Sequence, residues 1–565
     1  MRKGHVLVLT LVLLIIVSIF VVAILTNLSA YVKRVNLQNA KNLSHLGAQN
    51  LLQLSVAFLK PSFSGVRGVV LPWVNGNVSS NVGWWDRFKN WLFSQSDGDF
   101  WRNFFQRVNE NRYFDLSAVN EFNEALASFG LSGSTVVVPI TGTYMVGGNP
   151  YSVLVVSRNS VGKTESYALA VLAIDFLNKY AYFTERETRP GGGKIYFVTR
   201  DLIDGPMRSN DTINIWGNPI FRSTVEVGGV NIVSGSPSFE MGWKRLIQQD
   251  IEDYNMTKIK QNYANDLEAL VKPMNQFVTS DAESGIKLNL KGKTIQVGNN
   301  TRTAQKLIVE FKSAQGQGAD HFIRVSVEYR QGYTTGIDNL FTIKPREGAQ
   351  QITIHGENAR KWLDLTGIIP GSPSEYDKYV NFNGVLVSDL TIALKNHSNN
   401  DKPMYVDGRY TIYSKEDVEI YDHIVYEDFR DLFPHNRIDD IVVDNNLVDQ
   451  MKSSTRTDFL NIVADKYVWV KEKQRNLKIT ASIYAFDQSF QVENYDSGSS
   501  VGQLTIFGSL MQYYRGPVGT FSGDVIRTGY YKNYIYDYKI LEGMSAIGTP
   551  AKREGVVLLA VRGIY

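Results

Sequence analysis

The chain begins with an apolar run that is long enough to cross a membrane. Met1-Arg2-Lys3-Gly4 precedes an almost unbroken apolar stretch from His5 to Leu25, and no Gly or Pro follows until Gly47. About 20 helical residues span the ~30 Å hydrocarbon core of a bilayer. The sequence therefore predicts one membrane-anchoring helix with most of the 565 residues behind it. The residues assigned to this anchor are Val6, Leu9, Leu14, Ile16, Phe20 and Leu25.

The apolar run differs from a cleaved secretory signal. Such a signal has an apolar core of about 7–15 residues and a small-residue cleavage site, whereas this run is longer and continues into apolar residues at helical spacing as far as Pro61. We expect one helix over residues 1–60, apolar at first and amphipathic afterwards. Arg2 and Lys3 favour a cytoplasmic N-terminus and an exported remainder. A plain signal-anchor helix is one interpretation of this segment.

The N-terminus also resembles that of type IV pilins, and most closely that of PilX-type minor pilins. The shared features are a short basic leader ending in Gly4 and an intact apolar helix that starts at His5. The resemblance implies cleavage between Gly4 and His5 by a prepilin-type peptidase, with membrane lipid and other pilin-like subunits as partners. Major pilins carry Glu at the fifth position after the cleaved Gly, where this chain has Leu9. That departure fits a minor pilin at a filament tip, or a relative outside any pilus.

Composition excludes several classes of site. A net charge of +3 over 565 residues gives no global attraction to nucleic acid. The chain has no Cys, so it has neither disulfides nor thiolate metal ligands, and its seven His are scattered. We expect no cofactor, no metal and no small-molecule substrate. The 46 Gly and 30 Tyr favour β structure with many tight turns.

Changes of pattern along the chain predict the domain organisation. Short apolar-alternating segments such as Val385–Val387, Leu460–Val463 and Leu504–Ile506 are each followed by polar turns. Coils of this kind must stack to bury their apolar side chains, which favours a parallel β-solenoid. The predicted units are an aromatic-rich helical segment at 61–130, a first β region at 131–242 that begins the solenoid, a helical insertion at 243–284, a β insertion module at 285–375, a β-solenoid region at 376–545 and a C-terminal strand or tail at 546–565.

Two stretches resemble an uncharacterised bacterial domain family that occurs behind PilX-type N-termini. Gly205–Asn210 with Gly217–Phe221 is similar to its N-terminal signature, and Leu504–Gly519 with Gly529–Asp537 is similar to its C-terminal one. The layout also resembles that of large, ComZ-like minor pilins, in which a β-solenoid is inserted into a pilin body. Such a resemblance would imply a pilus-tip role, with DNA as one ligand, although layout alone does not transfer a function.

Three motifs with catalytic associations are weak in this chain. Gly162-Lys163-Thr164 lacks the first Gly of a P-loop, and Gly498–Gly502 matches the Gly-x-Ser-x-Gly pattern with no His after His435. Asp439 and Asp440 are the best candidates for paired catalytic acids or a metal site. Their neighbours in this cluster are His435, Asp444 and Asp449.

A tyrosine-rich basic segment near the C-terminus is the predicted ligand surface. Its members are Tyr513, Tyr514, Arg515, Lys532 and Tyr534. Tyr with Arg or Lys suits polysaccharide or single-stranded nucleic acid, through stacking and charge pairing. The alternative is that these tyrosines simply pack against solenoid coils.

Together these features predict a mainly β protein: a long N-terminal transmembrane and amphipathic α-helix, then a parallel β-solenoid-like ectodomain with helical and β insertions. We expect a non-enzymatic, single-pass membrane protein with an exported ectodomain that displays the solenoid at the cell surface or on a pilus. The alternatives are a static envelope scaffold and a β-helix enzyme that acts on polysaccharides.

Overall fold

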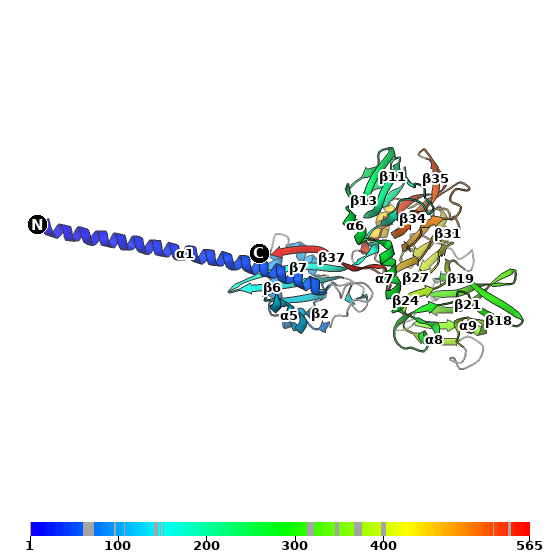
Figure 1. The fold of residues 1–565 in the computed structure, drawn as a ribbon, viewed down its shortest axis with the longest axis horizontal. Helices are drawn as coiled ribbons and strands as arrows, with labels where there is room; N and C mark the ends of the chain where they lie inside the picture. The colour runs from blue at the N-terminus through cyan, green and yellow to red at the C-terminus, as the bar shows by residue number, and fades with distance from the viewer. Residues whose placement is uncertain are drawn as a thin grey trace.

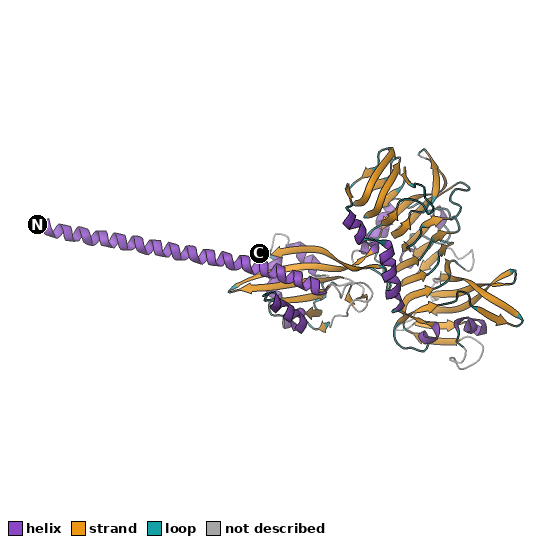
Figure 2. Ribbon diagram, viewed as in Figure 1, coloured by secondary structure: helices purple, strands orange, loops and turns teal. Residues whose placement is uncertain are grey.

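The computed structural model describes most of the chain as a mainly β protein with an N-terminal helix (Figure 2). The described residues are 2–59, 73–94, 98–106, 108–140, 145–146, 149–150, 152–312, 321–344, 350–365, 376–396, 403–523, 525–540 and 544–564. The side chains of residues 2–24 and 552–564 lie outside this description. Figure 1 shows three parts in line: a projecting helix, a small head and a larger β body.

Helix α1 (Arg2–Leu59) projects from the head and packs on it only with its last turns. Its buried positions recur at helical spacing: Ser44, Ala48, Leu51, Leu52, Ser55 and Leu59. Two hydroxyls fix the contact, because Ser44 Oγ donates to the carbonyl of Asn159 at 2.9 Å and Ser55 Oγ lies 2.9 Å from Thr135 Oγ1. At Gly47 a Cβ would lie 1.8 Å from Asn159 Nδ2, so a larger residue would displace this amide, which donates to the carbonyl of Ser44 at 3.3 Å.

The head is one antiparallel sheet that is covered on both faces. Its strands, in spatial order, are β1 (Val74–Asn75), β2 (Arg112–Asp115), β3 (Ser134–Pro139), β6 (Ser152–Val161), β7 (Thr164–Phe176) and β37 (Ala551–Ile564). Side chains alternate between the faces: Val137 and Val155 meet α1, whereas Val138 and Val156 face the other way. A separate two-stranded ribbon is formed by β4 (Met145–Val146) and β5 (Asn149–Pro150).

The aromatic-rich segment covers the second face of the head's sheet. The helices of the segment are α2 (Val78–Asn81), α3 (Trp85–Phe93) and α4 (Gly98–Phe105). Trp85 and Phe88 are buried and pack against Phe105 and Tyr167. The aromatic side chains therefore cover a sheet face. The first face holds η3 (Leu116–Ala118) and α5 (Asn120–Ser128) beside α1.

The large body is inserted between two neighbouring strands of the head. Strands β7 and β37 pair antiparallel, yet the chain leaves the head at Phe176 and returns at Ala551. The predicted first β region, 131–242, is therefore divided: β3, β6 and β7 belong to the head, and the body begins with β8 (Tyr182–Arg186). Periodicity along a strand shows which face is buried but not which strand is its partner, which explains the difference.

The body is a stack of parallel rungs, which we call the stack. Its first ladder runs β17–β24–β27–β30–β32–β34–β8–β11–β13–β15, and every pairing is parallel. The bounds are β17 (Ser284–Leu288), β24 (Phe382–Ser388), β27 (Arg409–Ser414), β30 (Phe459–Ala464), β32 (Lys478–Ala485), β34 (Ser500–Tyr514), β11 (Met207–Trp216), β13 (Val225–Ser234) and β15 (Trp243–Arg245).

A single column of inward side chains runs through this ladder in register. Its members, in order, are Ile286, Leu386, Ile412, Ile462, Ile483, Leu510, Tyr182, Met207, Val225 and Trp243. All are buried except Trp243, which is 47% exposed. Each rung thus buries its apolar residue on the next, as stacked repeats require.

Two further sets of strands complete the rungs. One is the parallel ladder of β25 (Thr391–Leu394), β28 (Val418–Ile420), β31 (Val468–Val470) and β33 (Phe490–Val492). The other strands are β26 (Met404–Val406), β29 (Ile424–Tyr426), β36 (Val525–Tyr536), β10 (Leu202–Asp204), β12 (Ile220–Phe221) and β14 (Ser238–Phe239). At the edge lie β9 (Tyr196–Val198), parallel to β11, and β35 (Gly519–Ser522), antiparallel to β36.

The chain enters the stack in its middle, builds outward to one end, and then restarts at the other end and builds back to the middle. From β8 it continues to β15, and then α6 (Gln248–Asp253) and α7 (Met256–Glu268) carry it back along the side nearer the head (Figure 1). Strands β16 (Val271–Pro273) and β17 restart the ladder at the other end. Helix α7 buries Ile259, Tyr263 and Leu267 among side chains of the first ladder. The predicted helical insertion at 243–284 therefore corresponds to the return path of the chain.

An antiparallel module covers the end of the stack that β17 begins. Its strands are β18 (Thr294–Val297), β19 (Asn300–Lys312), β20 (Phe322–Gln331), β21 (Thr334–Lys344), β22 (Gln350–Ile354) and β23 (Tyr376–Val380), with α9 (Gly356–Leu363) beside them. Strand β19 joins the stack by pairing parallel to β25. A short helix, α8 (Met274–Phe277), packs at the same end.

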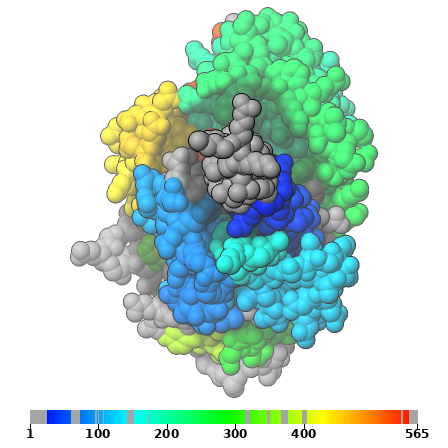
Figure 3. Space-filling view, turned by 90° about the vertical axis from the view of Figure 1, so that its left-hand side faces the viewer, coloured from blue at the N-terminus to red at the C-terminus, as the bar shows by residue number. Residues whose placement is uncertain are grey.

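The two chain segments that join head and stack are hydrogen-bonded onto the first ladder. Ser509 Oγ donates to the carbonyl of Asn178 at 3.0 Å, within η4 (Leu177–Lys179). Asn461 Nδ2 donates to Thr549 Oγ1 at 2.8 Å, and Tyr263 donates to the carbonyl of Gly548 at 2.8 Å. These bonds are buried, so both connections are held against the stack. Figure 3, which looks along α1, shows the head in front of the stack.

Candidate functional site

Exposed apolar side chains gather on the projecting part of α1. The large apolar residues exposed there are Leu25, Leu28, Tyr31, Val32, Val35, Leu37, Leu43 and Leu46. Soluble surfaces scatter such residues singly, and a long contiguous group marks a contact with lipid or protein. We call residues 25–46 of α1 the stem.

The predicted processing position and most of the predicted anchor belong to the residues whose side chains are not described. Gly4, His5, Val6, Leu9, Leu14, Ile16 and Phe20 lie outside the described side chains, and Leu25 is exposed on the stem. Within the residues described, no helix has the combined length and apolarity needed to cross a bilayer.

The predicted ligand surface is wrong for its charged members, because they are buried. Arg515 Nη1 donates to Glu187 Oε2 at 2.8 Å, and Lys532 Nζ donates to Asp201 Oδ2 at 2.6 Å. Tyr534 is buried as well. Tyr513 and Tyr514 are half-buried, with ring centroids 4.8 Å apart. The segment is largely internal, which fits the alternative interpretation in which its tyrosines pack against coils.

The buried ion pairs have a structural explanation. The Arg515 guanidinium lies over the Phe197 ring at 3.6 Å and donates to the carbonyl of Tyr196 at 3.1 Å. It thus ties the end of β34 to the β9 region. Burial lowers the pKa of Lys532, and the neighbouring Asp201 carboxylate opposes that shift. Sequence reasoning missed Glu187 and Asp201 because they precede their partners by 328 and 331 residues.

Lys532 nevertheless lines a cavity in the half of the stack that ends at β15, which we call the outer end. The cavity measures about 330 Å³. We call it the aromatic pocket, and its lining includes Arg189, Lys194, Tyr196, Tyr495, Phe521, Tyr530 and Lys532. The rings of Tyr196 and Phe521 lie 6.1 Å apart and nearly perpendicular.

The cations at the rim of the aromatic pocket carry unneutralised charge. Arg189 donates from Nε to the carbonyl of Gly192 at 2.8 Å and from Nη1 to the Tyr495 hydroxyl at 3.4 Å. Within the described part of the chain, neither Arg189 nor Lys194 has a carboxylate partner, and no acidic residue is among the lining residues. This pocket therefore combines exposed positive charge with aromatic walls.

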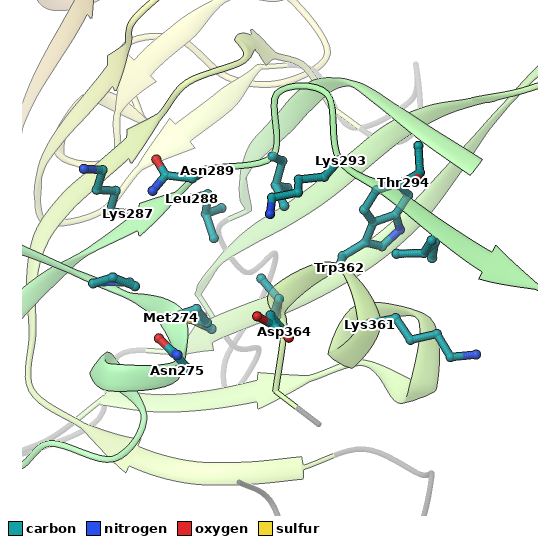
Figure 4. A pocket seen from close by; sticks show the side chains of 14 residues that line it. Met274, Asn275, Lys287, Leu288, Asn289, Lys293, Thr294, Lys361, Trp362 and Asp364 are labelled. Atoms are coloured by element: carbon teal, nitrogen blue, oxygen red, sulfur yellow. The ribbon is translucent and has the colours of Figure 1, made fainter. Parts of the chain in front are cut away.

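A second cavity, of about 400 Å³, lies at the covered end, and we call it the end cleft. Figure 4 shows Asn275, Asn289, Lys293 and Asp364 around its space, with Lys361 pointing away. Its floor is apolar, with buried Met274, Leu288 and Trp362. Two of its three lysines are neutralised, because Lys287 pairs with Glu268 and Lys361 pairs with Glu357, each at 2.6 Å.

The predicted acidic cluster does not form a paired-carboxylate site. Asp439 Oδ1 lies 2.8 Å from Nε2 of buried His423, whereas Asp440 pairs with Arg475 at 2.8 Å. Asp444 caps α10 (Asn445–Ser453), which holds Asp449 in its first turns. In the described regions no group of three or more His, Asp or Glu side chains could hold a metal ion. Each acid thus has a local structural partner or position.

Two other sequence motifs lie where a turn meets a strand. Gly162 and Lys163 form the hairpin turn between β6 and β7, where Gly162 has φ 61°, and Thr164 begins β7. Ser500 begins β34, so a strand follows it where a hydrolase elbow would need a helix.

One family model matches part of the chain. Residues 152–230 match the model of a domain of unknown function, DUF4900, which spans the boundary between head and stack. The predicted N-terminal signature of an uncharacterised family, at 205–221, falls within this range. A search of the curated proteins finds no match.

Among solved structures, the chain is similar to the competence-associated pilin ComZ from Thermus thermophilus. The identity is 9%, the TM-score is 0.26, and the alignment covers 76% of this chain and 84% of that one.

Proposed function

We propose that this chain is a membrane-anchored, pilin-like subunit that displays a β-solenoid at the cell surface. The observation that carries the proposal is the stem together with the head. One helix packs its last turns across an antiparallel sheet and projects its earlier turns, with eight large apolar side chains exposed between residues 25 and 46. A helix of this kind needs lipid or other helices to cover it.

The position of the stack supports a display role. It is inserted between β7 and β37, and both connections are hydrogen-bonded onto the first ladder. The parallel ladders and the in-register apolar column support the inference that the stack is a β-solenoid. Such an insertion leaves the helix and the head free to pack with other subunits while the stack points away from them (Figure 1).

We further propose that the role is not enzymatic. In support, Asp439 and Asp440, the best candidates for paired acids, take separate partners, His423 and Arg475. The static envelope scaffold differs from the pilin-like subunit only in what covers the stem, so the test addresses that contact.

The absence of Cys from the sequence allows a direct test by cross-linking. A Cys is placed on the stem as Leu28→Cys, and the matched control is Glu124→Cys on the exposed side of α5. Each full-length protein is oxidised in its native membrane and in the sheared surface fraction. We expect Leu28→Cys to form disulfide-linked species, either with a second copy of this chain or with a partner subunit that carries a Cys in its own helix. We expect Glu124→Cys to stay monomeric. A stem Cys that forms no cross-link in either fraction would contradict the pilin-like subunit.

A further inference from the structure

The aromatic pocket offers a binding site that the display role alone does not assign. Its volume of about 330 Å³ is at the lower end of the usual range of about 300–1,000 Å³ for ligand pockets. It therefore fits one or two rings of a larger ligand. The Tyr196 and Phe521 side chains are both half-buried, so part of each ring is available to a ligand.

The charges of the pocket select an anion. Arg189 and Lys194 are exposed at the rim and have no carboxylate partner among the described residues. Among the described residues that form the lining, none is Asp or Glu. At the floor, the Lys532 ammonium is held in place by Asp201, at 2.6 Å. A ligand that carries a negative group next to an apolar ring face satisfies both the rim and the walls.

We propose that the aromatic pocket binds an acidic saccharide. A sugar ring lies against Tyr196 and Phe521, and its carboxylate or sulfate group pairs with Arg189 and Lys194. The guanidinium of Arg189 is oriented by its bonds to Gly192 and Tyr495, so its remaining N–H groups are positioned for an oxyanion.

Nucleic acid fits these observations less well. Proteins that bind single strands line a long basic groove over about 4–16 nucleotides and show a strongly basic face. This chain has a net charge of +3 over 565 residues, and its unneutralised cations at this site are confined to the rim of one small cavity. A compact anionic ring is the better match to a site of this size.

The end cleft is less suited to an anion of this kind. Two of its three lysines are already neutralised by Glu268 and Glu357, and Asp364 stands among its lining residues. Lysines in the lining are therefore not enough to favour an anionic ligand, and of these two cavities the aromatic pocket is the better candidate to bind one.

To test the proposal, full-length protein in detergent is titrated with trigalacturonic acid and with its full methyl ester, and the two affinities are compared. The ester has the same rings but no charge. We expect the acid to bind at least tenfold more tightly than the ester. The double variant Arg189→Gln/Lys194→Gln should weaken binding of the acid at least tenfold. The control variant Lys244→Gln/Arg245→Gln removes the same charge from exposed β15 and should leave binding unchanged.

Several outcomes would overturn the proposal: equal binding of acid and ester, an equal loss in the control variant, or no binding of either trigalacturonic acid or a sulfated trisaccharide. Tighter binding of an eight-residue thymidine oligonucleotide, with affinity falling steeply with salt, would overturn it in favour of nucleic acid. None of these results depends on the stem, so failure here and failure of the pilin-like role are distinguishable.

Discussion

The two ends of the stack are built from the same ladder but finish differently. At the covered end, Ile286 of β17 is buried beneath β16, α8 and the antiparallel module. At the outer end, β15 is exposed along its whole length, and the ladder column finishes on half-exposed Trp243. Other large apolar residues are exposed near that end: Ile220, Ile232, Val233, Met241 and Ile247.

The difference shows that stacking alone does not complete this fold. Parallel rungs need a terminal cap that is polar or covered, because the last rung has no neighbour on which to bury its apolar side chains. One end meets this need with β18–β23 and α9. At the outer end β15 is left exposed, and the buried ion pairs of Arg515 and Lys532 hold the chain further in, around β8, β9 and β10. Stability at the two ends should therefore respond to different substitutions.

The largest effect is expected at the buried ion pair of Arg515 and Glu187, which lies in the half of the stack that ends at β15. Arg515→Met leaves the Glu187 carboxylate buried without its partner, which typically costs about 3–5 kcal/mol of unfolding free energy. Chemical denaturation of the full-length protein should show this loss, and hydrogen exchange should place it in residues 182–245. The control Arg475→Met breaks an exposed pair and should cost less than about 1 kcal/mol. Equal losses in both variants would contradict the fastening role of Arg515.

A pair of substitutions in the ladder column compares the middle of the stack with its outer end. Ile462→Ala opens a cavity in a fully buried position and should cost about 2–5 kcal/mol. Trp243→Ala removes a half-exposed ring and should cost less than about 1 kcal/mol, despite the greater volume removed. Thermal denaturation measures both. A larger loss for Trp243→Ala would mean that the outer end is covered in the folded protein.

The lowest upper limit is expected for an effect of pH, in the half of the stack nearer the covered end. Burial raises the pKa of Asp458 to about 7, opposed by hydrogen bonds from the Gly408 and Asp428 amides. Because the folded protein then holds a proton that the unfolded chain releases, this group makes stability fall as pH rises from about 4 to about 7. The contribution is at most about 4 kcal/mol, from 1.36 kcal/mol per pKa unit. Asp458→Asn should make the free energy of unfolding less dependent on pH over this range. An unchanged slope of unfolding free energy against pH would contradict the raised pKa of Asp458.

The sequence predicted the rungs better than it predicted their partners. Short segments such as Leu460–Val463 and Leu504–Ile506 do form stacked parallel strands, because their alternation marks a buried face. The division of residues 131–242 between two sheets was not predictable, since β7 pairs with a strand that lies almost 400 residues later in the chain. Local pattern carries no information about a partner at that separation.

The candidate site shows the same limit. Arg515 and Lys532 among tyrosines indicated an exposed basic surface, but their partners Glu187 and Asp201 lie more than 300 residues away and draw them into the interior. Lys532 still contributes to the aromatic pocket, whereas Arg189 and Lys194 were not anticipated at all. Their signal in the sequence, a Gly-rich turn at 191–193 between two cations, is too common to identify a site.

The most direct test of the pilin-like role is the mass of the N-terminal peptide from protein extracted from its native membrane. We expect a peptide that begins at His5, with a methylated amino group, because prepilin-type processing cuts after Gly4. A peptide that begins at Met1 or Arg2 would contradict that role and leave a fixed envelope scaffold as the better account.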